Sequence, residues 1–248
     1  MKHCGKELDC VRALVAREPG SNTVSSGSAS HEMQKPKPGS RIVNSAGVPG
    51  TLGCVARALH DGQPVLLSTW HVLFGNHASA RSPVWLHESG HRFSGIGKSL
   101  YGTLGNVHYA GQNYYMDCAV ASYQPRATAG GSEGLAWPVA GYGSVESGSV
   151  VTKAGAASGL TRGVVVDVNY SDTVFLHGKK WVAERQFLVR SLDQSGPFAV
   201  EGDSGAVVVD SANRAVGLLW GTRVNGEAVV TPIAPVLFAM NIAVACPV

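Results

Sequence analysis

Three polar residues, far apart in the sequence, have the side chains that nucleophilic catalysis needs. His71 follows the apolar run 65–67, Asp117 precedes the apolar run 118–121, and Ser204 lies in a Gly-Asp-Ser-Gly sequence. A serine hydroxyl is a poor nucleophile until an imidazole accepts its proton, and the imidazole needs a carboxylate to fix its tautomer. Together the three residues predict a site at which Ser204 attacks a carbonyl group.

The residues around Ser204 are suited to a reactive hydroxyl. Gly202 and Gly205 let the backbone adopt conformations closed to other residues, and they let another molecule approach closely. Backbone N–H groups in such a loop can point at developing negative charge. Taken alone, the same residues could be a tight turn that opens a buried strand at 207–209. The upstream histidine and aspartate favour the catalytic interpretation.

Three segments resemble the histidine, aspartate and serine motifs of trypsin/chymotrypsin-like serine peptidases of the PA clan, in the same order and at similar spacing. They are Ser68–Leu73, Tyr114–Ala121 and Glu201–Ala206. The resemblance covers Ile42 to the C-terminus, and with Thr51–Cys54 it is greatest to leaderless bacterial members. It implies an all-β fold of two six-stranded antiparallel β-barrels, with the active site between them and a C-terminal helix.

An α/β-hydrolase is excluded by the order and the local sequence of the motifs. Its nucleophile lies in a Gly-x-Ser-x-Gly elbow, and its serine precedes the acid and the histidine. In this chain Ala206 stands two residues after Ser204, and the serine comes last.

The resemblance implies a serine endopeptidase that hydrolyses a protein or peptide substrate through an acyl-enzyme intermediate. His71 would accept and return the proton, and Asp117 would orient and stabilise the imidazolium. The backbone N–H groups of Gly202 and Ser204 would form the oxyanion hole. The alternative is a catalytically silent or latent peptidase-like binding module, which a broken triad or a lost Gly202 would indicate. The sequence shows neither.

The resemblance also indicates which residues would bind the substrate. Phe198, six residues before the nucleophile, holds the place where aspartate selects Lys or Arg, so small or apolar side chains are expected. Leu219-Trp220-Gly221 resembles the strand that pairs with the substrate main chain, and Trp220 and Gly221 would form the pocket walls. If Glu201 instead reached into the pocket, it would favour a basic side chain.

Asp203 needs a partner, because a buried carboxylate is costly unless it is paired. In zymogens of the family, cleavage before an Ile-Val pair frees an amine that binds this aspartate, and Arg41-Ile42 resembles such a site. An activating protease would then be a partner of the chain. Arg162 is the rival, because related bacterial enzymes have an arginine near this point and need no cleavage.

Composition supports the all-β expectation and argues against several partners. Charged residues make up 15% of the chain, below the roughly 25% of an average protein, and 31 of the 248 residues are glycine. The net charge of +3 is too small to argue for nucleic acid or an anionic membrane. No stretch reaches the roughly 18 apolar residues of a membrane span. Neither a nucleic-acid partner nor a membrane is therefore expected.

The cysteines favour a reducing compartment. They stand at 4, 10, 54, 118 and 246, odd in number and scattered, and do not form a disulfide framework. Residues 1–20 are interrupted by charge and contain no apolar core of a signal peptide. The cytoplasm is the expected location, with secretion by a route not visible in the sequence as the alternative. No cofactor or metal is expected, because His3, Cys4 and Cys10 do not complete a four-ligand set.

The chain is predicted to consist of an N-terminal extension and one peptidase domain. The extension, residues 1–41, is expected to be largely flexible, with helical spacing of apolar residues at 6–17. The domain is expected to span 42–248. Its predicted divisions are a first barrel at 42–125, a second barrel at 140–234 and a C-terminal helix at 235–245.

Overall fold

The structure is a computed structural model that describes residues 12–13, 36–75, 78–88, 92–123, 139–176, 178–194 and 196–244. Most of the predicted extension, including His3, Cys4 and Cys10, lies outside these ranges. The two described residues inside the predicted helix at 6–17 form a strand, β1 (Arg12–Ala13). None of the helices in the described part of the chain is long and apolar enough to cross a membrane.

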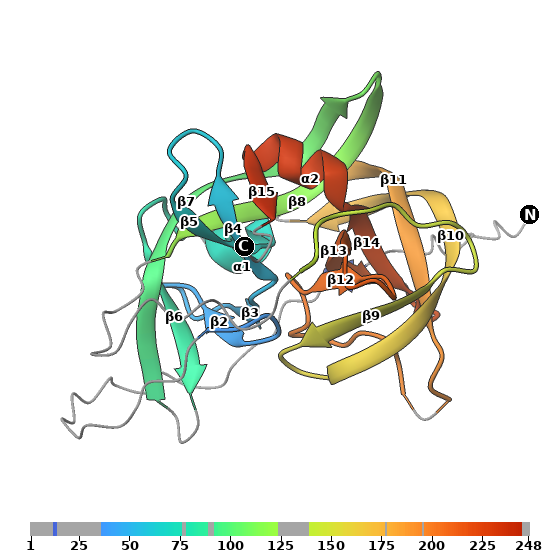
Figure 1. Ribbon diagram of the computed structural model, residues 1–248, viewed down its shortest axis with the longest axis horizontal. Coiled ribbons are helices and arrows are strands. Elements are labelled where there is room, and N and C mark those ends of the chain that lie inside the picture. The colour runs from blue at the N-terminus through green and yellow to red at the C-terminus, as the bar shows by residue number, and fades with distance from the viewer. Residues whose placement is uncertain are drawn as a thin grey trace, which may run out of the picture.

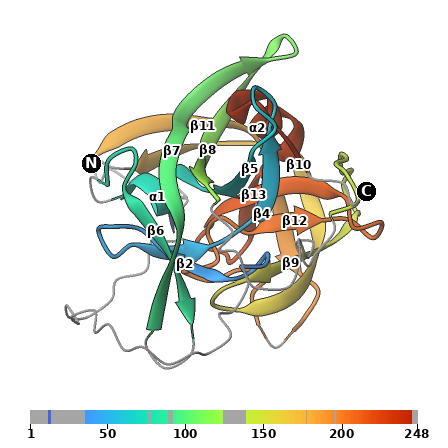
Figure 2. The ribbon, with the colours of Figure 1, turned by 60° about the vertical axis from the view of Figure 1, so that its left-hand side comes forward.

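The first sheet has eight strands, in the order β15-β4-β5-β8-β7-β6-β2-β3 (Figure 1). Their bounds are β2 (Arg41–Val43), β3 (Pro49–Thr51), β4 (Cys54–Ala58), β5 (Pro64–Ser68), β6 (Pro83–Glu88), β7 (Arg92–Tyr109), β8 (Gln112–Ser122) and β15 (Ile242–Val244). All neighbouring strands are antiparallel, and the five-residue helix α1 (Trp70–Phe74) directly follows β5. Figure 2 shows the β7–β8 hairpin extending beyond the rest of the molecule.

The second sheet has seven strands, in the order β1-β13-β12-β9-β10-β11-β14. The remaining bounds are β9 (Val150–Gly155), β10 (Gly159–Leu176), β11 (Lys179–Ser191), β12 (Val207–Val209), β13 (Ala215–Thr222) and β14 (Ala228–Pro232). Because β14 pairs with both β11 and β13, strands β9 to β14 close into a ring. The predicted all-β class, with two barrels and a C-terminal helix, is confirmed. Neither sheet has the predicted six strands: β1 brings the second sheet to seven, and the first has eight, of which β15 is one.

Helix α2 (Ile233–Met240) is shorter than the helix predicted at 235–245. It ends where Asn241 adopts the left-handed conformation, with φ 49°, and donates its backbone N–H to the last turn. The chain then forms β15, which pairs with β4 of the first sheet. The apolar pattern of this region therefore serves two elements, a helix and an edge strand.

The two barrels share buried side chains. Tyr115 of β8 lies between Trp181 of β11 and Trp220 of β13, with ring centroids 6.2 and 5.2 Å away. Below α2, Cys118 of the first barrel and Leu218 of the second belong to one buried cluster. These contacts fix the barrels against each other.

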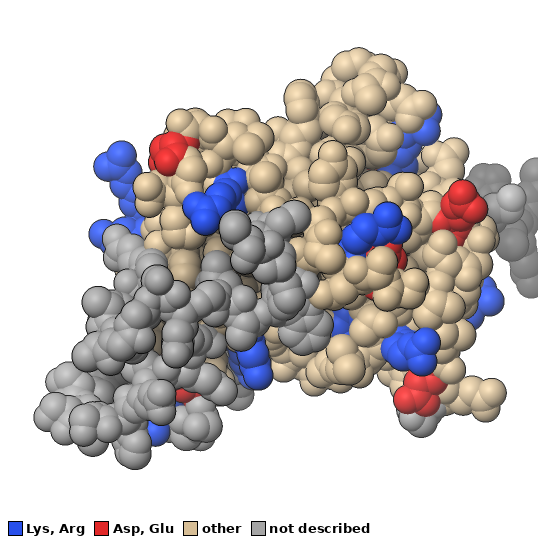
Figure 3. Space-filling view, viewed as in Figure 1, with Lys and Arg blue, Asp and Glu red and all other residues tan. Residues whose placement is uncertain are grey.

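On the face seen in Figure 3, charged residues of the described part are scattered without a large patch of one sign.

Candidate active site

The end of β5 and the middle of β8 bring His71 and Asp117 together. The two strands pair with Ser68 opposite Ala119, so Asp117 lies beside the helix that begins just after β5. His71 Nδ1 lies 2.5 Å from Asp117 Oδ2, and the His71 backbone N–H donates to Oδ1 at 3.0 Å. An ionised carboxylate can only accept, so Nδ1 carries the hydrogen and Nε2 is left as the basic nitrogen.

The backbone of Ser204 is bonded to the strands that position His71. Thr51, at the end of β3, donates its N–H to the Ser204 carbonyl at 2.8 Å. The carbonyl of Thr51 in turn accepts from Ser68 Oγ, just before α1. The Ser204 hydroxyl donates to the Trp220 carbonyl at 3.4 Å. His71 Nε2 has no hydrogen-bond partner among the described residues, so this conformation leaves the base and the hydroxyl unbonded to each other.

The loop that carries Ser204 requires its two glycines. Gly202 and Gly205 have φ of 97° and 96°, a region that other residues rarely adopt. A Cβ on Gly205 would lie 2.2 Å from Ser68 Oγ and 2.3 Å from the Thr51 carbonyl oxygen. The Gly202 carbonyl accepts from Thr51 Oγ1 at 2.8 Å. Thr51 thus holds the loop at two points, and neither glycine can be replaced without moving it.

Asp203 is paired with Lys153. Lys153 Nζ lies 3.0 Å from Asp203 Oδ2, and both side chains are fully buried. Ser158 Oγ and the Val200 N–H donate to the same oxygen at 2.5 and 3.0 Å, and the Ala157 and Ser158 N–H groups donate to Oδ1. Burial alone would raise the pKa of Asp203, but the Lys153 ammonium and these hydrogen bonds hold it below its usual value. Burial lowers the pKa of Lys153, and the attraction of Asp203 offsets this only partly.

The sequence-based choice of Arg162 as the partner of Asp203 was wrong, because Lys153 holds that place. Pairing with an Ile42 amine requires cleavage after Arg41 and stays a prediction. Arg162 faces Thr152 in the β9–β10 ladder, whereas Lys153 faces Thr161. Since side chains alternate between the faces of a strand, Arg162 points away from the side on which Lys153 is buried, and it is exposed. The backbone of Ile42 pairs with Gly50 and Leu86 inside the first sheet.

The predicted substrate-binding residues have different environments. Phe198 is fully buried in the core of the second barrel, with Lys153 Nζ 5.7 Å from its ring centroid. Trp220 is also buried, and its Nε1–H donates to Gln186 Oε1 at 2.8 Å. Glu201, by contrast, is exposed. Leu219 and Gly221 lie in β13 on either side of Trp220.

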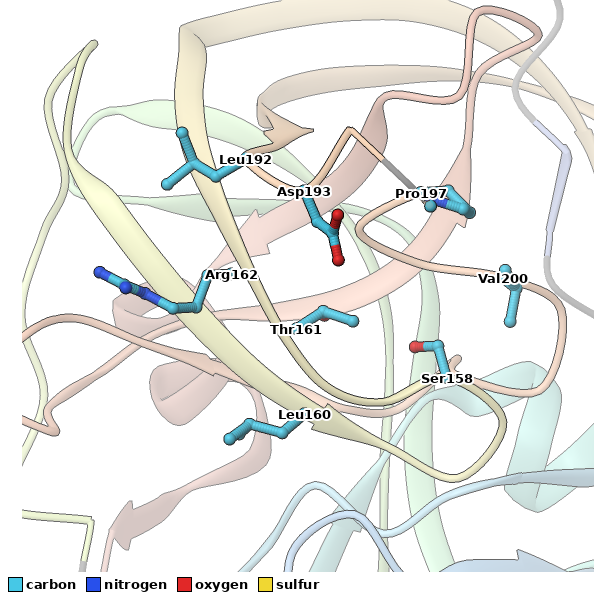
Figure 4. Close-up of a pocket in the computed structure, with 9 residues that line it drawn as sticks. Ser158, Leu160, Thr161, Arg162, Leu192, Asp193, Pro197 and Val200 are labelled. Atoms are coloured by element: carbon cyan, nitrogen blue, oxygen red, sulfur yellow. The ribbon is translucent and has the colours of Figure 1, made fainter.

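A cavity of about 670 Å³ lies between the start of β10 and the segment that follows β11 (Figure 4). Ser158 and Val200, which both bond to Asp203, form one side of it, and Arg162 and Asp193 also line it. His71, Asp117 and Ser204 are not among its lining residues. The cavity therefore lies beside residues that bond to Asp203 and is separate from the candidate catalytic residues.

The described residues offer no metal site, since no three His, Cys, Asp or Glu side chains gather among them. Cys54 and Cys118 are free and buried. Burial raises the pKa of Cys54 to about 12 and raises that of Cys118 as well. Both thiols are therefore protonated at neutral pH and belong to the core.

Three supporting residues were missed at the sequence level: Thr51, Lys153 and Gln186. Lys153 had a detectable signal. Along β9, residues 151, 153 and 155 face inward, and a lysine at an inward position requires a buried carboxylate nearby. Thr51 and Gln186 act on residues more than thirty positions away, and local sequence contains no sign of such bonds.

No family model and no curated protein matches the sequence. Solved structures that share the fold include a glutamic acid-specific serine protease, with 18% identity over 84% of this chain and 99% of that chain and a TM-score of 0.57. The Nocardiopsis protease NAPase has 18% identity, coverage of 84% and 98%, and a TM-score of 0.56. Cellulomonas bogoriensis chymotrypsin has 16% identity, coverage of 86% and 99%, and a TM-score of 0.55. The chain thus has the two-barrel fold of trypsin/chymotrypsin-like serine proteases.

Proposed function

We propose that the chain is a serine endopeptidase that acts on a protein or peptide through an acyl-enzyme intermediate. The observation that carries the proposal is the bonded pair of Asp117 and His71, whose basic Nε2 has no other partner in the described part of the chain. Ser204 is anchored through Thr51 to Ser68, at the end of the strand that precedes His71. The similar solved structures are serine proteases, which supports the same class of chemistry.

In the proposed mechanism, the Ser204 hydroxyl turns from the Trp220 carbonyl toward His71. Nε2 accepts the proton as Oγ forms a bond to the substrate carbonyl carbon, and Asp117 stabilises the imidazolium. The N–H groups of Gly202 and Ser204 hold the oxyanion. His71 then gives the proton to the leaving amine as the peptide bond breaks. Water repeats the sequence and releases the acid product from Ser204.

Lys153 explains how the loop can be formed in an uncleaved chain. In this proposal the buried ammonium does what a freed N-terminal amine does in zymogens, because it neutralises Asp203 and fixes the backbone on either side of Ser204. Cleavage at Arg41-Ile42 is therefore not part of the proposed mechanism. Specificity stays a prediction: small or apolar side chains are favoured, and Glu201, exposed beside the loop, is the residue that would draw a basic one.

A fluorophosphonate probe tests the proposal directly. We expect the probe to label the wild-type chain at Ser204, as mapped by peptide mass, and to leave Ser204→Ala unlabelled. Asp117→Asn should label about 10⁴-fold more slowly, because the imidazole loses its correct tautomer. Ser99→Ala, which removes a buried hydroxyl that bonds to Ser79 and not to the Ser204 loop, should still be labelled. If the wild type and the β1 variant described below both resist the probe, the chain is a silent binding module.

A further inference from the structure

On one side of strand β13, neither β12 nor the Ser204 loop pairs with the last two residues. The short strand β12 pairs with β13 only as far as Leu218. The nucleophile loop covers the next residue, since Gly205 N–H donates to the Leu219 carbonyl and Leu219 N–H donates to the Ala206 carbonyl, at 2.8 and 2.9 Å. Gly221 and Thr222 lie beyond both, and β14 pairs with them on the opposite side only.

Strand β1, from the N-terminal extension, occupies this open edge. Arg12 lies opposite Thr222 and Ala13 opposite Gly221, in antiparallel register. In the strand order of the sheet, β1 is the neighbour of β13 and ends the sheet on that side. A segment far upstream of the barrels is therefore paired beside the Trp220 carbonyl that holds the Ser204 hydroxyl.

A substrate main chain would need the same backbone groups. An extended peptide adds to a sheet edge through the N–H and C=O groups that the edge strand exposes, and each group pairs with one neighbour. A peptide that reaches Ser204 along β13 has to pass Gly221, where β1 now lies. In the same structure Ser204 is fully buried, so a polypeptide cannot reach its hydroxyl in this conformation.

We infer that strand β1 (Arg12–Ala13) is an intramolecular competitor of the substrate, which keeps the site latent until a peptide displaces it. This inference rests on the proposed peptidase function. Two paired residues make few hydrogen bonds, so tethering must supply much of the occupancy. A tethered segment has an effective concentration of the order of millimolar. The competitor lowers apparent affinity by the fraction of molecules whose edge is free and leaves turnover at saturation unchanged.

The test replaces both Arg12 and Ala13 with proline in the full chain. Proline has no N–H and fixes φ near −65°, so the pair of substitutions disrupts β1 whichever N–H faces β13. We expect KM for a peptide substrate to fall by roughly 3- to 10-fold with kcat unchanged. Ser21→Pro/Asn22→Pro, in the same extension, is the matched control and should keep the wild-type KM. Arg12→Ala, which removes the charge but keeps the N–H, should also keep it, and intact mass should show that the extension is retained.

A second measurement uses the wild-type chain, so that the conclusion does not depend on the proline variant folding. A tetrapeptidyl diphenyl phosphonate with alanine side chains, bound to Ser204, should displace β1 and speed hydrogen exchange of the peptide containing residues 12–13. Unchanged exchange, or an equal KM in all variants that fluorophosphonate still labels, would show that β1 does not compete, and the peptidase assignment would stand. Absence of labelling in every variant would instead overturn the peptidase assignment.

Discussion

Lys153 and Asp203 form an ion pair with fully buried side chains, immediately before Ser204. Two charges removed from water are tolerated only when each is paired and hydrogen-bonded, and Asp203 accepts from Ser158, Val200 and Ala157 as well. The pair therefore fixes the backbone on both sides of Asp203. Removing either charge should affect stability and the geometry of the loop together.

Lys153→Met keeps most of the side-chain volume and leaves the Asp203 carboxylate buried without a counter-charge. We expect the free energy of unfolding to fall by about 3–5 kcal/mol, measured by urea denaturation, and fluorophosphonate labelling to be lost. Lys153→Met/Asp203→Asn removes both charges of the pair and should recover part of the stability. A loss below about 1 kcal/mol in the single variant would contradict the role given to the pair.

The stabilisation by Asp203 should depend on pH. Its pKa in the folded chain lies below the usual value of about 3.9, so the folded state binds its proton less readily than the unfolded state. The contribution is therefore complete above about pH 4 and is lost as the pH falls through the lower folded-state pKa. Thermal unfolding between pH 7 and pH 2.5 should show the melting temperatures of wild type and Asp203→Asn converging only in the acid range. Parallel curves throughout would argue against an ionised Asp203.

For single residues, the sequence indicated the candidate catalytic side chains better than the residues that hold them in place. His71, Asp117 and Ser204 each stand in a short pattern that can be recognised locally, and the structure pairs the first two. The bond that the Ser204 hydroxyl makes to Trp220 could not be foreseen, because it depends on how β13 passes the loop. Lys153 could have been chosen over Arg162 if the inward face of β9 had been identified first.

Among the elements, the loop between Phe198 and β12 is the most constrained. Thr51 of the other barrel is bonded to it, Gly202 and Gly205 both adopt positive φ, and a Cβ on Gly205 would collide with Ser68 Oγ. The loop is bonded to Thr51 at the end of β3 and continues directly into β12, so its backbone is held at both places. Its conformation is therefore imposed by packing from both barrels.

Gly205→Ala tests this constraint. A Cβ there meets Ser68 Oγ and the Thr51 carbonyl in addition to the strained φ, so we expect a loss of about 2–5 kcal/mol in unfolding free energy. Gly62→Ala is the matched control: its φ of 71° is also positive, but nothing lies within 4 Å of the added Cβ, and about 1 kcal/mol is expected. Equal losses measured by urea denaturation would show that φ alone matters.

The ends of helices and strands were harder to predict from the sequence than their type. The apolar run after Pro235 predicted one helix, but it divides at Asn241 because 242–244 complete the edge beside β4. Strand β7 runs without a break from Arg92 to Tyr109, through Gly105. Its length is fixed by pairing with β8, which is tertiary information.

For the molecule as a whole, Thr51 joins the two barrels across the site. Its hydroxyl donates to the Gly202 carbonyl and accepts from the Ala156 N–H at 2.9 Å, both in the second barrel, while its backbone belongs to β3 of the first. The buried cluster of Tyr115, Trp181 and Trp220 holds the barrels at a second place. Together these contacts hold the Ser204 loop against the barrel that carries His71.

Thr51→Val tests whether the hydrogen bonds of the Thr51 hydroxyl, and not only its side-chain volume, hold the two barrels together. The valine fills the same space but leaves a buried carbonyl and a buried N–H unpaired, so the unfolding free energy should fall by about 1–3 kcal/mol for each group. The rate of fluorophosphonate labelling should fall as well. Thr51→Ser, which keeps the hydroxyl, should stay close to wild type in labelling rate. If valine and serine behave alike, the hydroxyl does not align the barrels.

The position of β15 has a consequence for biosynthesis. Residues 242–244 complete the edge of a sheet whose other strands are translated before residue 123. A nascent chain on the ribosome therefore holds an unfinished first barrel, with the edge of β4 uncovered, throughout synthesis of the second. Ribosome-bound intermediates should be sensitive to added protease and should engage chaperones at this edge until the last segment emerges.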